Sequence, residues 1–268
     1  MKRIAFIILA ALLATTLVAC SASEKSDLTS INDYMAPSYT EKIATGTITF
    51  ADGVGETAII TDYVGLYTAH AIEIPDTIQD RKVTTIGKEA FYYCTAATAI
   101  TIPNTVETIG DWAFASCVSL ETIVIPASVK TIGKGAFNGC TSLKTVIFEG
   151  AGAVSIGDYA FNDCSALESI TLPASLTTIG VEAFRDCSAL TSFTCPEALE
   201  SIGNLAFYGC TGLNADDALV LSASITEIGE FAFADINKLY IEAPEGSYAA
   251  EYVAEMRDFV EVETEDAE

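Results

Sequence analysis

The chain has 268 residues, half of them hydrophobic, which is enough for one domain or a short repeat array with an apolar core. Its 37 acidic and 13 basic residues give a formal charge of −24, and a surface of this sign repels nucleic acids and anionic membranes. We therefore expect no nucleic-acid partner.

The first residues have the organisation of an export signal. Two basic residues precede an apolar run of 15 residues, shorter than the roughly 20 residues of a membrane-spanning helix. The run ends in Leu-Val-Ala-Cys at 17–20, which resembles the bacterial lipobox, whose cysteine becomes the lipidated first residue of the mature protein. We predict a lipoprotein signal peptide over 1–19 and a membrane anchor through lipid on Cys20. The alternative is an ordinary signal peptide cleaved near Ala19.

The segment before the first repeat divides into two parts. Residues 20–44 begin with a polar, small and aperiodic stretch, which favours a flexible tether. Residues 45–82 contain three runs typical of short strands, at 47–50, 57–61 and 71–74. We expect these runs to form an N-terminal β cap, because the end of a repeat array exposes an apolar face that must be covered.

A unit of six residues, Ile-Gly-x-x-Ala-Phe, occurs seven times, with spacings of 23, 23, 24, 23, 23 and 26 residues. A unit of this size cannot bury its own apolar face, so the copies must stack on one another. The phenylalanine at a fixed place in each copy should then form an internal column of rings. The predicted core column consists of Phe91, Phe114, Phe137, Phe161, Phe184, Phe207 and Phe233.

The residues between the copies predict short strands. In the stretch 120–126, Leu-Glu-Thr-Ile-Val-Ile-Pro, apolar and outward positions alternate as in a half-buried strand, and the proline ends it. A second extended piece leads into Ile132. Gly133 is expected to supply a turn conformation that other residues rarely adopt, and 135–140 are expected to form a brief helical turn.

The whole unit, over Ile72–Ile241, resembles the repeats of BspA-type leucine-rich-repeat surface proteins of host-associated bacteria and some mucosal parasites. The resemblance implies an α/β-type repeat: a leucine-rich-repeat solenoid over 83–241, with seven repeats of about 23 residues, short strands and short helical turns, capped at both ends. The pattern is irregular at three places. The strand at 146–150 lacks the proline, Cys195 occupies an apolar slot, and 213–219 carries extra residues.

Residues 242–268 predict a C-terminal helical cap followed by an acidic tail, since they contain ten acidic residues and one basic residue. Ser247 can act as the N-cap of the helix. The helix would present one apolar stripe to the last coil, formed by Ala249, Tyr252, Val253, Met256 and Val260.

Six of the eight cysteines follow the repeated phenylalanine by three residues, at Cys94, Cys117, Cys140, Cys164, Cys187 and Cys210. Their regular spacing favours a column of buried thiols that pack as small apolar side chains. Disulfides between neighbouring repeats are the alternative in an exported protein. Zinc sites need close pairs of ligands, so we expect no metal site.

The strand residues that alternate with the inward ones predict a broad, Thr-rich outer face with few charges. The candidate binding residues are Thr101, Val124, Ile147, Thr171, Thr194, Val220 and Tyr240 in a central row, and Thr122, Thr145, Ser169 and Ser192 beside it. Solenoids commonly bind macromolecules on such a face. The alternative is that the β-branched residues are present only for their strand propensity.

No catalytic motif is found. His70 is the only histidine, and the chain has no Gly-x-Ser-x-Gly elbow, phosphate loop or His/Glu metal motif. We therefore expect neither enzymatic activity nor a cofactor. The resemblance implies a lipid-anchored protein, exposed on the cell envelope, that binds a protein or glycan ligand and mediates adhesion to host or other cells. The alternative is a structural or scaffolding envelope protein that binds other bacterial components.

Overall fold

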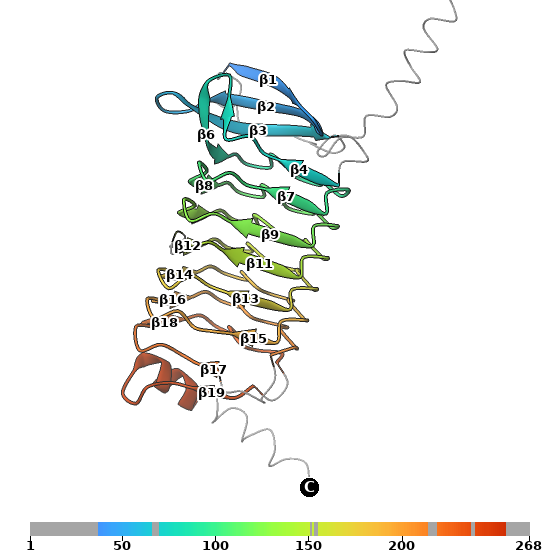
Figure 1. Cartoon of the computed structure of the whole chain (residues 1–268). Coiled ribbons are helices and arrows are strands. Elements are labelled where there is room, and N and C mark those ends of the chain that lie inside the picture. Colours follow the sequence, from blue (N-terminus) through green and yellow to red (C-terminus); the bar gives the residue numbers. More distant parts are fainter. Residues whose placement is uncertain are drawn as a thin grey trace, which may run out of the picture.

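The chain is a parallel β-solenoid of about seven turns with little helix, which confirms the predicted leucine-rich-repeat architecture (Figure 1). The computed structural model describes residues 37–65, 70–150, 152, 155–213, 219–236 and 239–255. The predicted signal peptide, Cys20, most of the tether and the acidic tail lie outside these residues.

One side of the solenoid is sheet A, in which each coil contributes a short strand. Its parallel strands are β6 (Arg81–Ile86), β8 (Thr108–Ile109), β10 (Thr131–Ile132), β12 (Ser155–Ile156), β14 (Thr178–Ile179), β16 (Ser201–Ile202) and β18 (Glu227–Ile228). Neighbouring strands are in register, so Ile132 pairs with Ile109 and Ile156, and these isoleucines are buried. The residue before each isoleucine points outward, as a pleated strand requires.

The adjacent side of the solenoid is sheet B. Its strands are β4 (Ala71–Glu73), β7 (Ala99–Thr101), β9 (Thr122–Ile125), β11 (Thr145–Phe148), β13 (Ser169–Thr171) and β15 (Ser192–Phe193). Sheet B ends at β15, and the last coils form a separate parallel pair, β17 (Leu219–Val220) with β19 (Ile241–Glu242). In the sequence, the extra residues at 213–219 lie between β15 and β17, where sheet B ends.

The third side of each coil is a series of tight turns and not a helix. Trp112 and Ser116 have positive φ angles of 56° and 59°. The Trp112 and Phe114 N–H groups donate to carbonyl oxygens of the next coil, at 2.7 and 2.8 Å. The short helical turn expected here is reduced to single i→i−3 hydrogen bonds, such as Ala113 to Gly110 at 3.3 Å and Ala115 to Trp112 at 3.1 Å, because every second N–H group bonds to the next coil and prevents a continuous helix.

The glycine of the Ile-Gly unit is required by the close approach of successive coils. Gly133 does not have the positive φ angle that the sequence analysis expected. Instead, a Cβ atom on Gly133 would lie 2.7 Å from the backbone nitrogen of Asp111 and the carbonyl carbon of Gly110 in the preceding coil. Gly157 meets the backbone of Gly133 in the same way, also at 2.7 Å. Any larger residue would push the coils apart.

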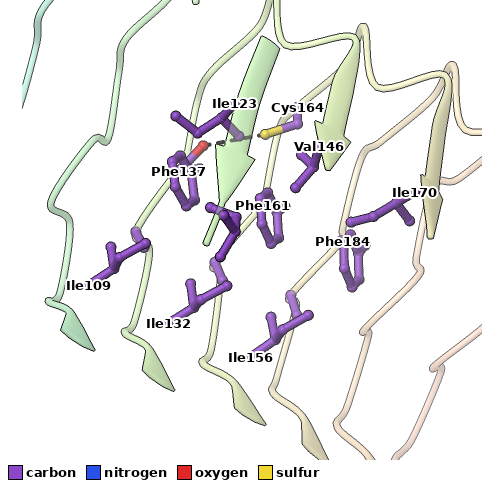
Figure 2. Close-up of a cluster of buried hydrophobic side chains, with 14 of the residues drawn as sticks. Ile109, Ile123, Ile132, Phe137, Val146, Ile156, Phe161, Cys164, Ile170 and Phe184 are labelled. Carbon is purple, nitrogen blue, oxygen red and sulfur yellow. Dashed lines mark hydrogen bonds between the residues drawn. The ribbon is translucent and has the colours of Figure 1, made fainter. Parts of the chain in front are cut away.

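The structure places all seven repeated phenylalanines in the core, in one column. Successive rings from Phe91 to Phe233 are stacked with centroid separations of 5.1 to 5.3 Å. Figure 2 shows Phe137, Phe161 and Phe184 side by side, between isoleucines of sheet A and the inward residues of sheet B. Stacking at this spacing makes each ring cover the next, so the apolar core is continuous along the rod.

Antiparallel strands lie at the N-terminal end of the stack. They are β1 (Ser38–Ile43), β2 (Gly46–Asp52) and β3 (Thr57–Gly65), and β3 pairs in parallel with β6, which also pairs with β5 (Thr77–Ile78). Tyr63 of β3 stacks on Phe91 at 5.1 Å and so continues the aromatic column. Strand β1 lies within 20–44, so the predicted tether is wrong for its last residues. The reason is a tight hairpin that brings Tyr39 to 5.4 Å from Phe50.

A short helix over 248–255 lies at the other end of the stack. The Ser247 hydroxyl accepts a hydrogen bond from the Ala250 N–H group at 3.2 Å, as an N-cap does. Ala249 and Val253 are buried, and Tyr252 packs against the edge of Phe233 at 6.5 Å. The expected stripe residues Met256 and Val260 lie outside the described residues. Within the described ranges, no helix has the length and apolar composition needed to cross a bilayer.

Candidate binding surface

The column of cysteines lies inside the solenoid, and its buried thiols have low reactivity. The five cysteines Cys117, Cys140, Cys164, Cys187 and Cys210 are free and buried, so the described structure favours the thiol column over disulfides between these neighbours. The expectation of a free thiol is wrong for the first member of the column, Cys94, which is buried but disulfide-bonded. Each thiol donates a hydrogen bond to the phenylalanine carbonyl oxygen of the preceding coil, such as Cys164 to Phe137 at 3.3 Å (Figure 2). Burial raises the pKa of the Cys140, Cys164 and Cys187 thiols, so these groups stay protonated and are poor nucleophiles at neutral pH.

Other candidate chemical groups do not converge. In the part of the chain that the structure describes, no three His, Cys, Asp or Glu side chains are placed to hold a metal ion. His70 is exposed, and its backbone carbonyl oxygen accepts hydrogen bonds from the Thr98 and Ala99 N–H groups. The surface that the repeats build is therefore the feature to consider for binding.

From β7 to β15, the outward residues of sheet B form a regular, mostly exposed and uncharged surface, and the first strand, β4, adds the exposed carboxylate of Glu73 to the same central row. We call this the sheet B face, and it consists of Thr101, Val124, Ile147, Thr171 and Thr194 in a central row and Thr122, Thr145, Ser169 and Ser192 in a flanking row. Most of these residues are exposed. The exposed fractions of the apolar residues Val124 and Ile147, neighbours in the central row, are 37% and 46%. The strand ladder holds both rows in register across the coils.

Two predicted members of the face lie elsewhere. Val220 pairs with Glu242 and not with Tyr240, so Tyr240 belongs to the flanking row of its coil and the central row ends in a carboxylate. Both Val220 and Tyr240 are exposed, but they belong to the separate β17–β19 pair beyond the break in sheet B. Val220 and Glu242 are 22 positions apart, one fewer than the usual 23-residue repeat, so this register does not follow from the regular spacing.

Between β7 and β15 the sheet B face contains no acidic residue, although Glu73 of β4 continues its central row, and charged residues that are mostly acidic lie along both of its margins. Glu121, Lys144 and Glu168 precede β9, β11 and β13, and all three are exposed. Glu149 and Glu197 are exposed just past the other ends of the strands. The Lys144 ammonium lies 3.5 Å from the Glu121 carboxylate, and such an exposed ion pair contributes little stability. The face is therefore a neutral strip between two acidic margins.

Sheet A offers a weaker candidate surface. Each of its two-residue strands presents one outward side chain, and most of these, such as Thr108, Ser155 and Thr178, are only half-exposed. No exposed large apolar residue lies on its outward row in the described part of the chain. Sheet B is therefore the side on which a partner could bury apolar surface.

A further set of polar residues was not predicted and stabilises the turns. The side-chain oxygens of Asp111, Asp158 and Asn204 accept hydrogen bonds from the N–H groups of Lys134, Val181 and Glu230 in the next coil, each at 2.9 Å. The sequence signal was available, since an Asp or Asn follows the Ile-Gly pair in every second copy, 47 and 46 residues apart. These residues are structural and not part of the binding surface.

A solenoid of stacked strand-and-turn coils with one exposed strand face defines a leucine-rich-repeat binding scaffold, and leucine-rich-repeat proteins generally bind proteins. The chain matches the family described as "BspA type Leucine rich repeat region" over residues 67–152 and 154–248, in six copies. The chain therefore belongs to the BspA-type leucine-rich-repeat family. No curated protein matches it.

Two solved structures are similar to the chain over most of its length. A leucine-rich repeat protein of T. pallidum, TpLRR, is 27% identical, with a TM-score of 0.66, and the match covers 77% of this chain and 92% of that one. A leucine-rich repeat protein from Eubacterium ventriosum is 29% identical, with a TM-score of 0.61, over 74% of this chain and 50% of that one. These likenesses support the coil geometry described above.

Proposed function

We propose that the protein is exported, anchored to the bacterial cell envelope by lipid on Cys20, and binds a protein or glycan of a host or another cell through the sheet B face. The observation that carries this proposal is the sheet B face itself, on which apolar β-branched residues are exposed in a chain of charge −24. An uncharged strip of Thr and Ser residues with exposed Val124 and Ile147 at its centre, between charged margins, is compatible with an interaction surface.

The export signal and family support the location. The apolar run and the Leu-Val-Ala-Cys sequence at 17–20 favour a lipoprotein, and BspA-type repeats resemble those of bacterial surface proteins. Mass spectrometry of the protein purified from its native membrane tests the anchor. We expect a mature N-terminus at Cys20 carrying acyl chains, and release of the Cys20→Ala variant from the membrane fraction. A mature chain that begins elsewhere and carries no lipid would contradict the anchor but not the binding surface.

Binding can be tested with immobilised host matrix proteins and surface glycans. The variant Ile147→Lys places a charge at the centre of the sheet B face, and we expect it to weaken saturable binding at least about tenfold. The matched control is Thr131→Lys, which adds the same charge to the exposed position of sheet A in the adjoining strand β10. Equal binding by both variants and the native chain would overturn the assignment of this face.

The scaffolding role is the alternative outcome of a second experiment. Affinity purification from the native envelope would identify partners of the anchored protein. Recovery of a stoichiometric bacterial partner through the sheet B face, with no saturable binding to any host ligand, would replace adhesion by a structural role in the envelope.

A further inference from the structure

We infer that the sheet B face receives an extended, positively charged polypeptide segment. This inference rests on the proposed function and specifies the chemistry of the partner. It depends on the size of the strip, on the groups that it presents and on the charges along its margins.

The size of the strip excludes a large partner interface. The uncharged rows span five strands, β7 to β15, which at about 4.8 Å per strand gives a length of roughly 24 Å. Three residues of strand give a width of about 10 Å, so the flat area is on the order of 240 Å². A stable dimer buries about 800 Å² on each partner. A second copy, which also carries a charge of −24, therefore fits poorly, whereas one extended chain of about seven residues matches the length.

The groups on the strip favour a polypeptide over a glycan. The two rows contain only the methyl and hydroxyl groups of Thr, Ser, Val and Ile. No aromatic ring, amide, carboxylate or guanidinium group lies in them, and these are the groups that fix the orientation of a sugar by stacking or paired hydrogen bonds. Methyl and hydroxyl groups suit the small apolar and polar side chains of an extended peptide.

The margins select the charge of that peptide. Glu121 and Glu168 stand at one margin and Glu149 and Glu197 at the other, and only Lys144 offsets them. Lysine and arginine have long apolar stems, so their charged ends can reach a margin while the stems cover the strip. An acidic segment, an anionic lipid surface or a nucleic acid would instead be repelled.

The test uses the full mature chain and two synthetic peptides of about nine residues, which is about one residue more at each end than the seven that span the strip. One peptide alternates valine with lysine, and the other alternates valine with glutamate. We expect saturable binding of the lysine peptide only, weakening at least about tenfold between low and high salt because the attraction to the margins is screened.

Charge-removing variants locate the site. The triple variant Glu149→Gln, Glu168→Gln, Glu197→Gln should weaken binding of the lysine peptide roughly tenfold and reduce its salt dependence. The control triple Glu107→Gln, Glu200→Gln, Glu227→Gln removes the same charge from exposed positions beside sheet A and should leave most of the affinity.

The outcomes separate this inference from the proposed function. If Ile147→Lys abolishes capture of the native ligand but the charge variants and salt have no effect, the cationic partner is wrong and the binding face stands. If the glutamate peptide or a neutral oligosaccharide binds as well as the lysine peptide, the inference is overturned. A concentration-dependent dimer that Ile147→Lys dissociates would overturn it in favour of a second copy. If Ile147→Lys changes no binding of any kind, both proposals fail.

Discussion

The aromatic column and the strand ladder of sheet B behave differently along the same rod. The rings stack without interruption from Tyr63 to Phe233. Sheet B stops at β15, and only the separate pair β17–β19 follows. The comparison indicates that the turn unit, with its phenylalanine and close-packed glycine, maintains the stack, whereas the strand face tolerates irregular coils.

The turn unit and the strands of sheet B differ in the number of contacts that fix the spacing between coils. In the turn unit, a buried ring, a thiol hydrogen bond and a backbone contact at the glycine all depend on the same coil spacing. A residue of sheet B has one buried side and one free side, so an insertion between strands disturbs only the ladder at that point. Function therefore can vary on sheet B without loss of the fold.

Deleting a ring from the column should give the largest effect. Phe161 is fully buried between Phe137 and Phe184, so Phe161→Ala leaves a cavity with apolar walls on both sides and should reduce the free energy of unfolding by about 3–5 kcal/mol. Phe193→Ala removes the same atoms at the last strand of sheet B, where the ring is 8% exposed and contacts the column through Phe207 at 4.6 Å without being a member of the stack, and it should cost less. Urea denaturation followed by circular dichroism measures both, and equal losses would contradict a special role for the column.

Substitution of the close-packed glycine should give the second-largest loss of stability. Gly157→Ala puts a methyl group 2.7 Å from the Gly133 backbone, which cannot move without separating the coils, so we expect a loss of about 2–3 kcal/mol. Gly139→Ala is the control, because Gly139 has a φ of 69° but its Cβ would meet nothing closer than 3.6 Å. Only conformational strain of about 1 kcal/mol applies there. A smaller loss for Gly157→Ala than for Gly139→Ala, measured by the same denaturation, would show that backbone contact is not the constraint.

Much of the fold can be predicted from the sequence because the same pattern of apolar residues and glycine occurs in seven copies. The spacing of Ile-Gly-x-x-Ala-Phe required stacking, and the alternation around Ile123 placed the strands of sheet B. The reason for Gly133 was not predictable in the same way, since close contact and positive φ both select glycine. That the turns keep only alternate i→i−3 hydrogen bonds was not predictable, because Ala136, Phe137 and Cys140 have a spacing that a helix and these turns both place on one face.

The candidate surface was predictable in its regular part only. Val124 and Ile147 could be placed outward because one strand pattern repeats between coils. Tyr240 could not be placed, since Val220 and its partner Glu242 are 22 positions apart and the last strand therefore departs from the 23-residue repeat. The acidic margins were also missed, because Glu149 and Glu168 become neighbours of one strip only when the coils are stacked.

The thiol column predicts a loss of stability at high pH. In the folded chain burial keeps Cys164 protonated, while in the unfolded chain its pKa returns to about 8.5. The raised folded pKa means that its contribution is fully present below pH 8.5 and decreases as the pH rises above that value. Replacing Cys164 by Ala should remove roughly 1 kcal/mol of the decrease between pH 8 and pH 9.5. Cys195, half-buried at the break in sheet B, should contribute less. The free energy of unfolding is measured from pH 8 to pH 9.5 for the native chain, Cys164→Ala and Cys195→Ala. An equal dependence on pH in all three proteins would contradict the argument.

The smallest effect should come from the side-chain hydrogen bond that joins alternate turns. Asp158→Ala removes the acceptor of the Val181 N–H group at 2.9 Å and should cost about 1 kcal/mol, because the donor lies in a narrow space between coils. Asp158→Asn keeps an acceptor at the same place, as Asn204 does two coils later, and should be close to neutral. The matched control is Glu168→Ala, which removes an exposed carboxylate on the margin of sheet B, away from the turns. Hydrogen exchange of the Val181 amide gives the local readout. Faster exchange in Asp158→Ala alone is expected, and equal exchange in all three variants would mean that the backbone contacts hold the turns without this bond.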